Sequence, residues 1–369
     1  MDMKKIGLIT FFRNNYGSAL QCYSTKHFIE GLGYQCEIVE KKYTFFEKLQ
    51  RKIYYYSHKI FNSKSWGYKS CLMDNSKLRI DSFISQELKP CDYTTEELNA
   101  VGNKDDFIGF VTGSDQVWNV NGYIDDMYFL KFALPHKKIG FAVSLGTDKL
   151  NIRQKRRIKN KIKDFEAISV REKSTKYELE LLLGKSIDLI SDPTILLTPE
   201  EWKKFSTNGI SYEEDYILLH FIDSPNRIAL NCLRKYKQKN SKIICFGYKH
   251  SELDAFEEIE LISGDPVDYV SLISKASCVL TDSYHTTLFS IYFNREFRVF
   301  EREYQTKYSQ NIRLQHILNL YNLEECYNCD DVGIQSQYDS SKIMQRERLC
   351  TADFLKNKID GIAQKEDAE

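Results

Sequence analysis

The residues with the clearest chemical potential lie in Thr281-Asp-Ser-Tyr-His-Thr-Thr287, directly after a short apolar run. That run, Cys278–Leu280, predicts a buried strand, and the apolar spacing after the motif predicts a helix. His285, Thr286 and Thr287 should therefore lie where the strand ends and the helix begins. Free backbone N–H groups and the helix dipole favour an anion there, and histidine titrates near neutral pH. The pattern predicts an anion site with a proton carrier, although a purely structural turn would give the same pattern.

A second polar loop, Gly113-Ser-Asp-Gln-Val-Trp-Asn119, follows the predicted buried strand Phe107–Thr112. Its carboxylate and amide groups can hydrogen-bond sugar hydroxyls, and its indole can stack on a sugar ring or simply close the loop. The carboxylate could instead cap a helix. The density of polar groups favours a site, so we predict acceptor binding by Asp115, Gln116, Trp118 and Asn119.

Two further predicted strands end in residues that could bind an anion. Lys5–Phe12 is followed by the turn Asn14-Asn-Tyr-Gly-Ser18, whose backbone N–H groups could contact a ligand, although Gly17 could equally serve only the turn. Ala167–Val170 carries Arg171 at its end. A guanidinium is planar and can bind a carboxylate through two parallel hydrogen bonds.

The motif Thr281-Asp-Ser-Tyr-His-Thr-Thr-Leu-Phe-Ser-Ile291 resembles the signature TDS-aromatic-HG-x-x-FSI of the polysaccharide pyruvyl transferase family. Four other stretches match the same family in order, namely Asn15–Gln21, Val111–Asn119, Ile168–Ser174 and Ser191–Thr194. The resemblance covers most of the chain. It implies a GT-B-like fold and transfer of pyruvate from phosphoenolpyruvate to a sugar.

The resemblance also implies roles for the polar residues at the strand ends. His285 would act as general acid or base, Arg171 would clamp the donor carboxylate, and Asp115 or Asp282 would orient an acceptor hydroxyl, unless Asp282 only caps a helix. The expected donor contacts are Ser283, Thr286, Thr287, Asn15, Gly17 and Ser18.

The motif departs from the family at two positions. Many members carry Arg where this chain has Ser283, and Gly is common where it has Thr286. A lost arginine removes a partner for phosphate or carboxylate, so either the donor differs or another cation substitutes. Lys275 and Arg298 are candidates that lie near the motif in sequence.

Both halves of the chain alternate strands with helices, which predicts an α/β fold of two facing Rossmann-like domains with a cleft between them. This agrees with the GT-B-like fold that the resemblance implies. The expected organisation is a first domain over 1–210 with an aromatic and basic insertion at 41–105, a second domain over 211–340, and a C-terminal helix and tail over 341–369. Apolar runs predict strands at Lys5–Phe12, Gln35–Val39, Phe107–Thr112, Lys138–Val143, Ala167–Val170, Ile187–Ile190, Tyr216–Phe221, Lys242–Phe246, Glu260–Ile262, Cys278–Leu280 and Phe297–Phe300.

Composition narrows the function classes. The 369 residues include 52 basic and 52 acidic side chains, so the chain has no nucleic-acid signature. Its ten cysteines are scattered, and no Asp-x-Asp pair or zinc motif occurs, so we expect no metal and no cofactor besides the donor substrate. Free thiols and the lack of a signal peptide or long apolar run predict a cytoplasmic protein.

Two segments could touch a membrane. Residues 41–69 combine nine aromatic and eight basic residues with one acid, and residues 149–163 hold eight basic residues and no acid. Such segments could contact the inner membrane surface or a lipid-linked glycan. An inserted helical subdomain and a solvated helix face are the alternative interpretations.

The resulting hypothesis is a metal-independent pyruvyl transferase in surface or capsular exopolysaccharide biosynthesis, acting on phosphoenolpyruvate and a sugar or lipid-linked glycan. A GT-B glycosyltransferase using a nucleotide sugar and a non-catalytic glycan-binding relative remain alternatives. The sequence leaves open the acceptor sugar, the linkage, the ketal stereochemistry and the oligomeric state.

Overall fold

A seven-stranded parallel sheet forms the first half of the computed structural model. The structure describes residues 3–61, 72–102, 106–121, 123–238, 241–256, 258–302, 311–331 and 338–366. The strand order is β3-β2-β1-β4-β5-β6-β7. The strands are β1 Lys5–Ile9, β2 Gln35–Lys41, β3 Cys91–Tyr93, β4 Phe107–Thr112, β5 Lys138–Val143, β6 Ala167–Val170 and β7 Asp188–Leu189. The central strands β4 and β5 are buried along their whole length, as expected for parallel strands covered on both faces.

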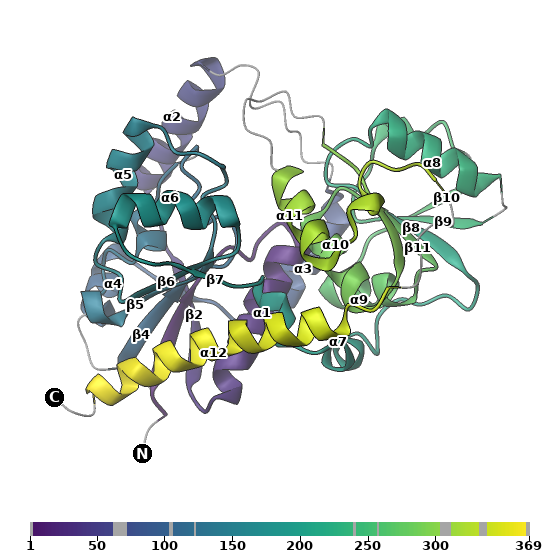
Figure 1. Cartoon of the computed structure of the whole chain (residues 1–369). Coiled ribbons are helices and arrows are strands. Elements are labelled where there is room, and N and C mark those ends of the chain that lie inside the picture. The colour runs from purple at the N-terminus through teal and green to yellow at the C-terminus, as the bar shows by residue number, and fades with distance from the viewer. Residues whose placement is uncertain are drawn as a thin grey trace.

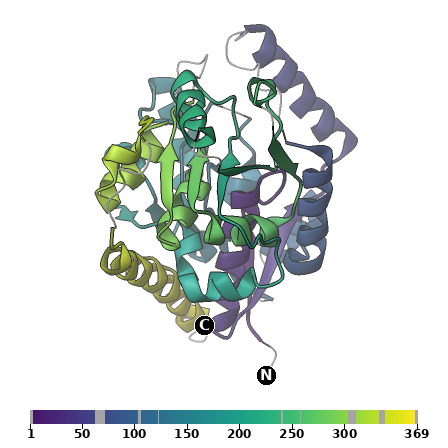
Figure 2. The ribbon, with the colours of Figure 1, turned by 90° about the vertical axis from the view of Figure 1, so that its right-hand side faces the viewer.

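The second half contains a five-stranded parallel sheet in the order β10-β9-β8-β11-β12. Figure 2 is turned so that this half faces the viewer. Its strands are β8 Tyr216–His220, β9 Lys242–Phe246, β10 Ile259–Ile262, β11 Cys278–Thr281 and β12 Glu296–Val299. The register pairs Thr281 with His220 and with Val299. Because the strands are parallel, the loops after β8, β11 and β12 leave the sheet at the same edge.

Helices connect the strands in both halves (Figure 1). They are α1 Tyr16–Gly31, α2 Phe45–Phe61, α3 Asp74–Phe83, α4 Thr95–Gly102, α5 Ile152–Ile162, α6 Lys173–Leu183, α7 Pro199–Phe205, α8 Arg227–Lys237, α9 Pro266–Lys275, α10 Tyr284–Tyr292, α11 Asn311–Tyr321 and α12 Ser341–Glu366. Side-chain caps begin several of them. Asn15 caps α1 and Asp265 caps α9, each by accepting hydrogen bonds from backbone N–H groups of the first turn.

The long helix α12 crosses from the second half back to the first sheet (Figure 1). Its apolar side chains, including Phe354 and Leu355, belong to the same core as Phe141 of β5, and Phe354 stacks on Phe141 with ring centroids 6.2 Å apart. Near its end, Glu366 pairs with the buried Lys137 at 2.9 Å. The helix therefore ties the second half to the first sheet.

The predicted pair of Rossmann-like sheets is confirmed. The edge strand β3 was not predicted, and it places part of the proposed insertion 41–105 inside the first sheet. Residues 62–71 and 103–105 of that segment lie outside the described residues. Among the helices that the structure describes, none combines the length and the apolar character that a membrane span requires.

Candidate active site

The first turn of α10 faces the carboxyl ends of the first sheet. Ser283 is the N-cap of α10, and His285 is the second residue of the helix. The His285 ring lies on Gly17 near the start of α1, so closely that a Cβ at position 17 would come within 2.0 Å of Nδ1 of His285. Only a residue without a side chain fits between the α1 backbone and this ring. The structure thus brings the predicted histidine together with one of the predicted donor residues.

Arg171, at the end of β6, is the centre of a buried ion network, and its side chain is 1% exposed. Each of its three nitrogens donates to a carboxylate from a different position: Nη1 to Asp192 at 2.6 Å, Nη2 to Asp115 at 3.1 Å and Nε to Glu172 at 3.2 Å. This corrects the expected bidentate clamp on the donor, because the guanidinium already holds the protein's own carboxylates. Its position fixes the loops after β4, β6 and β7 relative to one another.

Burial and ion pairing act in opposite directions on the pKa values of this network. Burial raises the pKa of Asp192, but the charges of His285 and Arg171 outweigh burial and hold this pKa well below its usual range. Burial likewise raises the pKa of Asp115, and Arg171, His285 and Arg313 lower it below its ordinary value. The carboxylates raise the pKa of Arg171 despite the opposing effect of burial. At neutral pH the network therefore carries fixed charges of both signs.

His285 is oriented toward one member of this network. Its Nε2 lies 3.5 Å from Oδ2 of Asp192, and among the described residues that buried nitrogen has no hydrogen-bond partner. The other oxygen of Asp192 accepts from the backbone N–H of Thr194 at 3.0 Å and from its hydroxyl at 2.9 Å. The carboxylate is thus held in place, and it can stabilise a proton on His285 while the imidazole exchanges that proton with a ligand.

A second cation, Arg313 from α11, reaches the same place. The guanidinium carbons of Arg171 and Arg313 lie 5.0 and 5.7 Å from the centroid of the Tyr284 ring. Arg313 Nη1 also lies 3.9 Å from Oδ1 of Asp115. A small pocket opens beside these groups between the two halves, lined by Gln116, Ser144, Gly146, Thr147, Asp148, Glu172, Ser174, Thr175, Ile312 and Arg313.

Arg313 is therefore a cation that the fold, and not the motif, brings to this network. The two cations considered from sequence lie elsewhere. Lys275 is exposed at the end of α9. Arg298 is buried in β12, where its side chain donates to the carbonyl oxygens of Phe297 at 2.8 Å and Asp331 at 3.0 Å.

In the loop after β4, one predicted acceptor residue, Gln116, lines the small pocket, whereas another, Trp118, is buried in the core. Trp118 is fully buried, stacks on Phe129 and donates from Nε1 to the carbonyl oxygen of Tyr128 at 2.9 Å. The prediction that Trp118 stacks on a sugar is therefore wrong, because its indole closes the loop against the core. Gln116 lines the small pocket, and its Oε1 accepts a hydrogen bond from Asn119 at 2.9 Å.

Several residues predicted to bind the donor form hydrogen bonds within the protein instead. Thr286 and Thr287 are fully buried: the hydroxyl of Thr286 bonds that of Tyr269 at 2.8 Å, and the hydroxyl of Thr287 donates to the Ser283 carbonyl at 2.9 Å. The Ser283 hydroxyl accepts from the Thr286 N–H. This start of α10 is packed against α9, so the predicted phosphate position at Thr286 and Thr287 is corrected.

At the start of α1, two predicted residues have structural partners near the network. Asn15 accepts from the backbone N–H of Ser18 at 3.0 Å and so caps α1. The Ser18 hydroxyl donates to Oδ2 of Asp115 at 2.8 Å. Ser18 thereby joins the first turn of α1 to the network that Arg171 organises.

Asp282 is buried and does not face His285. Its two carboxylate oxygens accept from the backbone N–H groups of Ile222 at 2.7 Å and Asp223 at 2.8 Å, and Arg302 Nε donates to one of them at 3.0 Å. Burial raises the pKa of Asp282 above its ordinary value. The expected catalytic role of Asp282 is corrected to that of a brace for the loop after β8.

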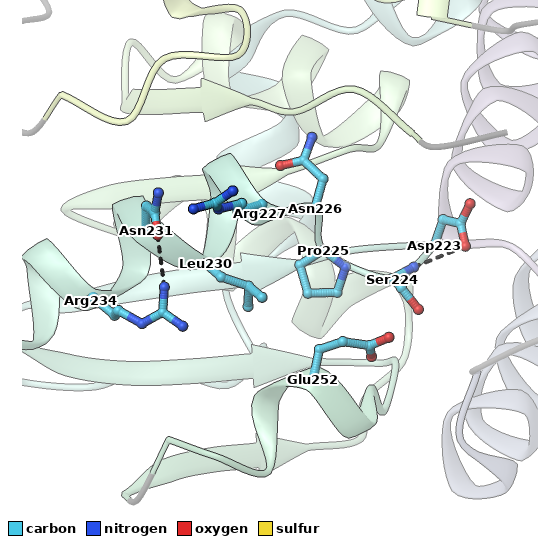
Figure 3. Close-up of a pocket in the computed structure, with 9 residues that line it drawn as sticks. All are labelled: Asp223, Ser224, Pro225, Asn226, Arg227, Leu230, Asn231, Arg234 and Glu252. Carbon is cyan, nitrogen blue, oxygen red and sulfur yellow. Dashed lines mark hydrogen bonds between the residues drawn. The ribbon is translucent and has the colours of Figure 1, made fainter.

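That braced loop forms one end of a second cavity, of about 690 Å³, along α8 (Figure 3). Figure 3 shows Asn231 and Arg234 on α8 beside it, joined by a hydrogen bond of 2.7 Å, with Asp223 at the end of the cavity. Its lining residues are Asp223, Ser224, Pro225, Asn226, Arg227, Leu230, Asn231, Arg234 and Glu252. The lining is polar and charged, as suits a ligand rich in hydroxyl or anionic groups.

Sequence reasoning missed four residues of the network: Glu172, Asp192, Tyr284 and Arg313. The first three lie inside matched motifs, so the position of each after a strand was available as a signal. No sequence signal marked Arg313, because it comes from a helix outside every motif. Within the described residues, no group of three or more His, Cys, Asp or Glu is arranged to hold a metal ion.

Comparison with known proteins identifies relatives of this architecture. The model of the polysaccharide pyruvyl transferase family matches residues 15–304. No curated protein matches the chain. Among solved structures, UDP-N-acetylglucosamine 2-epimerase from Rickettsia bellii is similar with a TM-score of 0.50 at 12% identity, covering 98% of each chain. The S. aureus MnaA–UDP structure is similar with a TM-score of 0.51 at 13% identity, covering 96% of this chain and 98% of that chain. At these identities the similarity confirms the GT-B-like fold alone.

Proposed function

Since the chain belongs to the polysaccharide pyruvyl transferase family, we propose that it transfers pyruvate from phosphoenolpyruvate to a pair of sugar hydroxyls in surface or capsular polysaccharide synthesis. The observation that carries this proposal is the buried imidazole of His285, held between Gly17 and Asp192 at the meeting point of the two halves. A proton carrier beside fixed positive charge is what the ketal-forming reaction requires.

The reaction divides into four events. A proton adds to the methylene carbon of phosphoenolpyruvate, and one sugar hydroxyl attacks the adjacent carbon and loses its own proton. The C–O bond to phosphate breaks, and a second hydroxyl closes the ring and loses its proton to the departing phosphate, leaving a ketal and inorganic phosphate. We assign the proton exchange to His285, with Asp192 stabilising the charged imidazole.

We assign the anionic groups of the donor to Arg313. Arg171 is already held by three carboxylates, so its role in this proposal is to position the strand ends. Arg313 lines the small pocket and is the arginine we assign to direct contact with the donor. Because the guanidinium of Arg313 supplies positive charge in this proposal, we expect transfer to continue in the presence of a metal chelator.

We assign the acceptor to the cavity along α8. Its volume of about 690 Å³ lies within the size range of small-molecule sites, and its amide and guanidinium groups can hydrogen-bond sugar hydroxyls or the phosphates of a lipid-linked glycan. The cavity begins at the loop that Asp282 braces, three positions before His285 in the chain. Arg227→Gln should therefore raise the KM for the acceptor and leave the KM for phosphoenolpyruvate unchanged.

The test of this function is a transfer assay with purified protein, phosphoenolpyruvate and a panel of lipid-linked and nucleotide-linked glycans. The expected result is release of inorganic phosphate together with a glycan whose mass increases by one pyruvyl ketal. Stabilisation against heat by phosphoenolpyruvate should accompany it. Stabilisation by a nucleotide sugar, with no effect of phosphoenolpyruvate and no phosphate release, would contradict the proposal.

A further inference from the structure

Four apolar side chains in the first half of helix α2 lie on the face that points away from the protein. Phe45, Phe46, Leu49 and Ile53 are 75%, 74%, 42% and 59% exposed. Their spacing places them on one side of the helix. In both views α2 stands at the periphery of the molecule (Figure 1 and Figure 2).

The opposite face of α2 holds the helix to the protein through polar and aromatic contacts. Glu47 pairs with Lys41 at 2.6 Å, and Arg51 pairs with Asp125 at 3.0 Å. Tyr54 packs edge-on against Tyr123, with ring centroids 5.5 Å apart. A surface helix of a globular protein normally turns its apolar stripe inward. Here the orientation is reversed, so the apolar stripe is available to something outside the chain.

Helix α5 carries positive charge in the same half of the molecule as α2 (Figure 1). It buries Gln154, Ile158 and Ile162 and leaves a basic face exposed. Within the described part of the chain, no ion pair involves the exposed side chains of Arg153, Arg156, Arg157 and Lys159. The Ile152 side chain is also exposed at the start of this face.

The two helices are attached to the same short segment. Arg51 of α2 pairs with Asp125, and Lys161 of α5 pairs with the neighbouring Asp126. Lys48 and Lys52 are exposed as well and flank the apolar stripe on α2 itself. The apolar stripe and the unpaired basic face therefore belong to one end of the molecule.

We propose that this end, defined as the outward faces of α2 and α5 and called here the α2–α5 surface, docks on an anionic lipid bilayer. Aromatic and aliphatic side chains of α2 enter the headgroup region, while the arginines and lysines bind anionic headgroups. Charge complementarity selects this occupant, because a second copy of the chain would place the basic α5 faces of two protomers close together. The proposal is independent of the transfer reaction.

The test is flotation of the purified full chain with vesicles of phosphatidylcholine alone or mixed with an equal part of phosphatidylglycerol. We expect flotation with the anionic vesicles, little with the neutral ones, and release at high salt. The triple variant Phe46→Ser, Leu49→Gln, Ile53→Gln should lower the bound fraction at least about tenfold. Its matched control is Leu78→Gln, Leu181→Gln, Leu349→Gln, which removes exposed apolar residues elsewhere and should bind like wild type.

A second pair of variants tests the charge. Arg156→Gln, Arg157→Gln, Lys159→Gln should weaken binding to the anionic vesicles, whereas the exposed set Lys203→Gln, Lys204→Gln, Lys356→Gln should not. All the substituted side chains are exposed, and thermal melting checks that each variant is folded. The proposal is overturned if wild-type protein floats with neither kind of vesicle. It is also overturned if a variant and its control lose vesicle binding equally. A concentration-dependent dimer that the α2 variant abolishes while vesicle binding is unchanged overturns it as well, because the occupant would then be a second copy.

Discussion

The imidazole ring of His285 lies against the backbone of Gly17, and a Cβ at that glycine would come within 2.0 Å of Nδ1. The contact joins the start of α10 in the second half to the start of α1 in the first. Because neither helix can approach further, the contact sets the depth at which the histidine sits between the two halves.

Gly17→Ala should destabilise the protein by about 1–3 kcal/mol, the usual cost of overpacking, and should lower transfer activity by displacing His285. Gly31→Ala in the same helix is the matched control, because a Cβ there meets nothing within 4 Å. Alanine is the better helix former, so that control should be neutral or slightly stabilising. Urea unfolding of both variants measures the difference, and equal stabilities would contradict the close contact.

His285→Gln should reduce turnover roughly 10²–10⁴-fold, because glutamine cannot exchange a proton near neutral pH. The affinity for phosphoenolpyruvate should be nearly unchanged, because the glutamine side chain is similar in size to the histidine that it replaces. His27→Gln, an exposed position on α1, serves as the control. Steady-state kinetics and donor-dependent heat stabilisation separate the two effects. Wild-type turnover in His285→Gln would leave the motif as a structural turn.

Arg171→Lys should destabilise the fold by on the order of 3 kcal/mol, because one ammonium group cannot hold the three buried carboxylates that the planar guanidinium holds. The exposed Arg153→Lys on α5 should change stability little. Thermal and urea unfolding measure the effect. If Arg171→Lys keeps wild-type stability and loses only donor affinity, Arg171 binds the donor directly and our reassignment is wrong.

Arg313→Gln should raise the KM for phosphoenolpyruvate about tenfold or more, because a charged hydrogen bond contributes roughly 1.5–3 kcal/mol. Lys275→Gln is its control, since the exposed Lys275 lies near the motif in sequence but outside the small pocket. Kinetics with varied donor at saturating acceptor provides the measurement. Equal effects of the two substitutions would remove Arg313 from the donor site.

His220 should make the protein less stable in mild acid. Burial lowers its pKa to about 3 in the folded protein, whereas an unfolded histidine titrates near 6.5. Between these values the unfolded chain binds a proton that the folded protein does not, so stability falls as the pH falls, by up to ~1.4 kcal/mol per pH unit. In His220→Gln, the free energy of unfolding should therefore fall less steeply as the pH is lowered.

Urea unfolding of wild type, His220→Gln and the exposed control His27→Gln between about pH 6 and about pH 4.5 measures this slope. His220 packs among Tyr16, Tyr248 and Tyr269 and its Nδ1 lies 3.1 Å from the Phe246 carbonyl, so the variant starts less stable, and only its slope is diagnostic. The lowered pKa values of Asp115 and Asp192 act at lower pH. Identical slopes in all three proteins would refute the buried neutral state.

Apolar runs predicted most of the fold. Strands β4, β5, β6 and β9 have the bounds expected from sequence, because each is a continuous apolar run that a sheet covered on both faces requires. The edge strand β3 escaped prediction because its three residues, Cys91–Tyr93, are only partly covered and form no apolar run.

The site was harder to predict because its partners are brought together by the fold. Sequence placed His285 and Arg171 at strand ends, and the structure has them there. It could not show that carboxylates after β4, β6 and β7 converge on Arg171, nor that α11 delivers Arg313. An aromatic residue in a polar loop fits both stacking and packing, and for Trp118 only the burial of its ring decides between them.

Helix α12 has a consequence for the order of synthesis. It emerges from the ribosome after every strand of both sheets, yet its Phe354, Leu355, Ile359 and Ile362 complete a core that includes Ile108 and Phe141 of the first sheet. Until α12 has been translated, that face of the nascent first half lacks part of its cover. The first half therefore cannot finish folding as an independent unit during translation. The apolar face that α12 later covers stays accessible to chaperones until the end of synthesis.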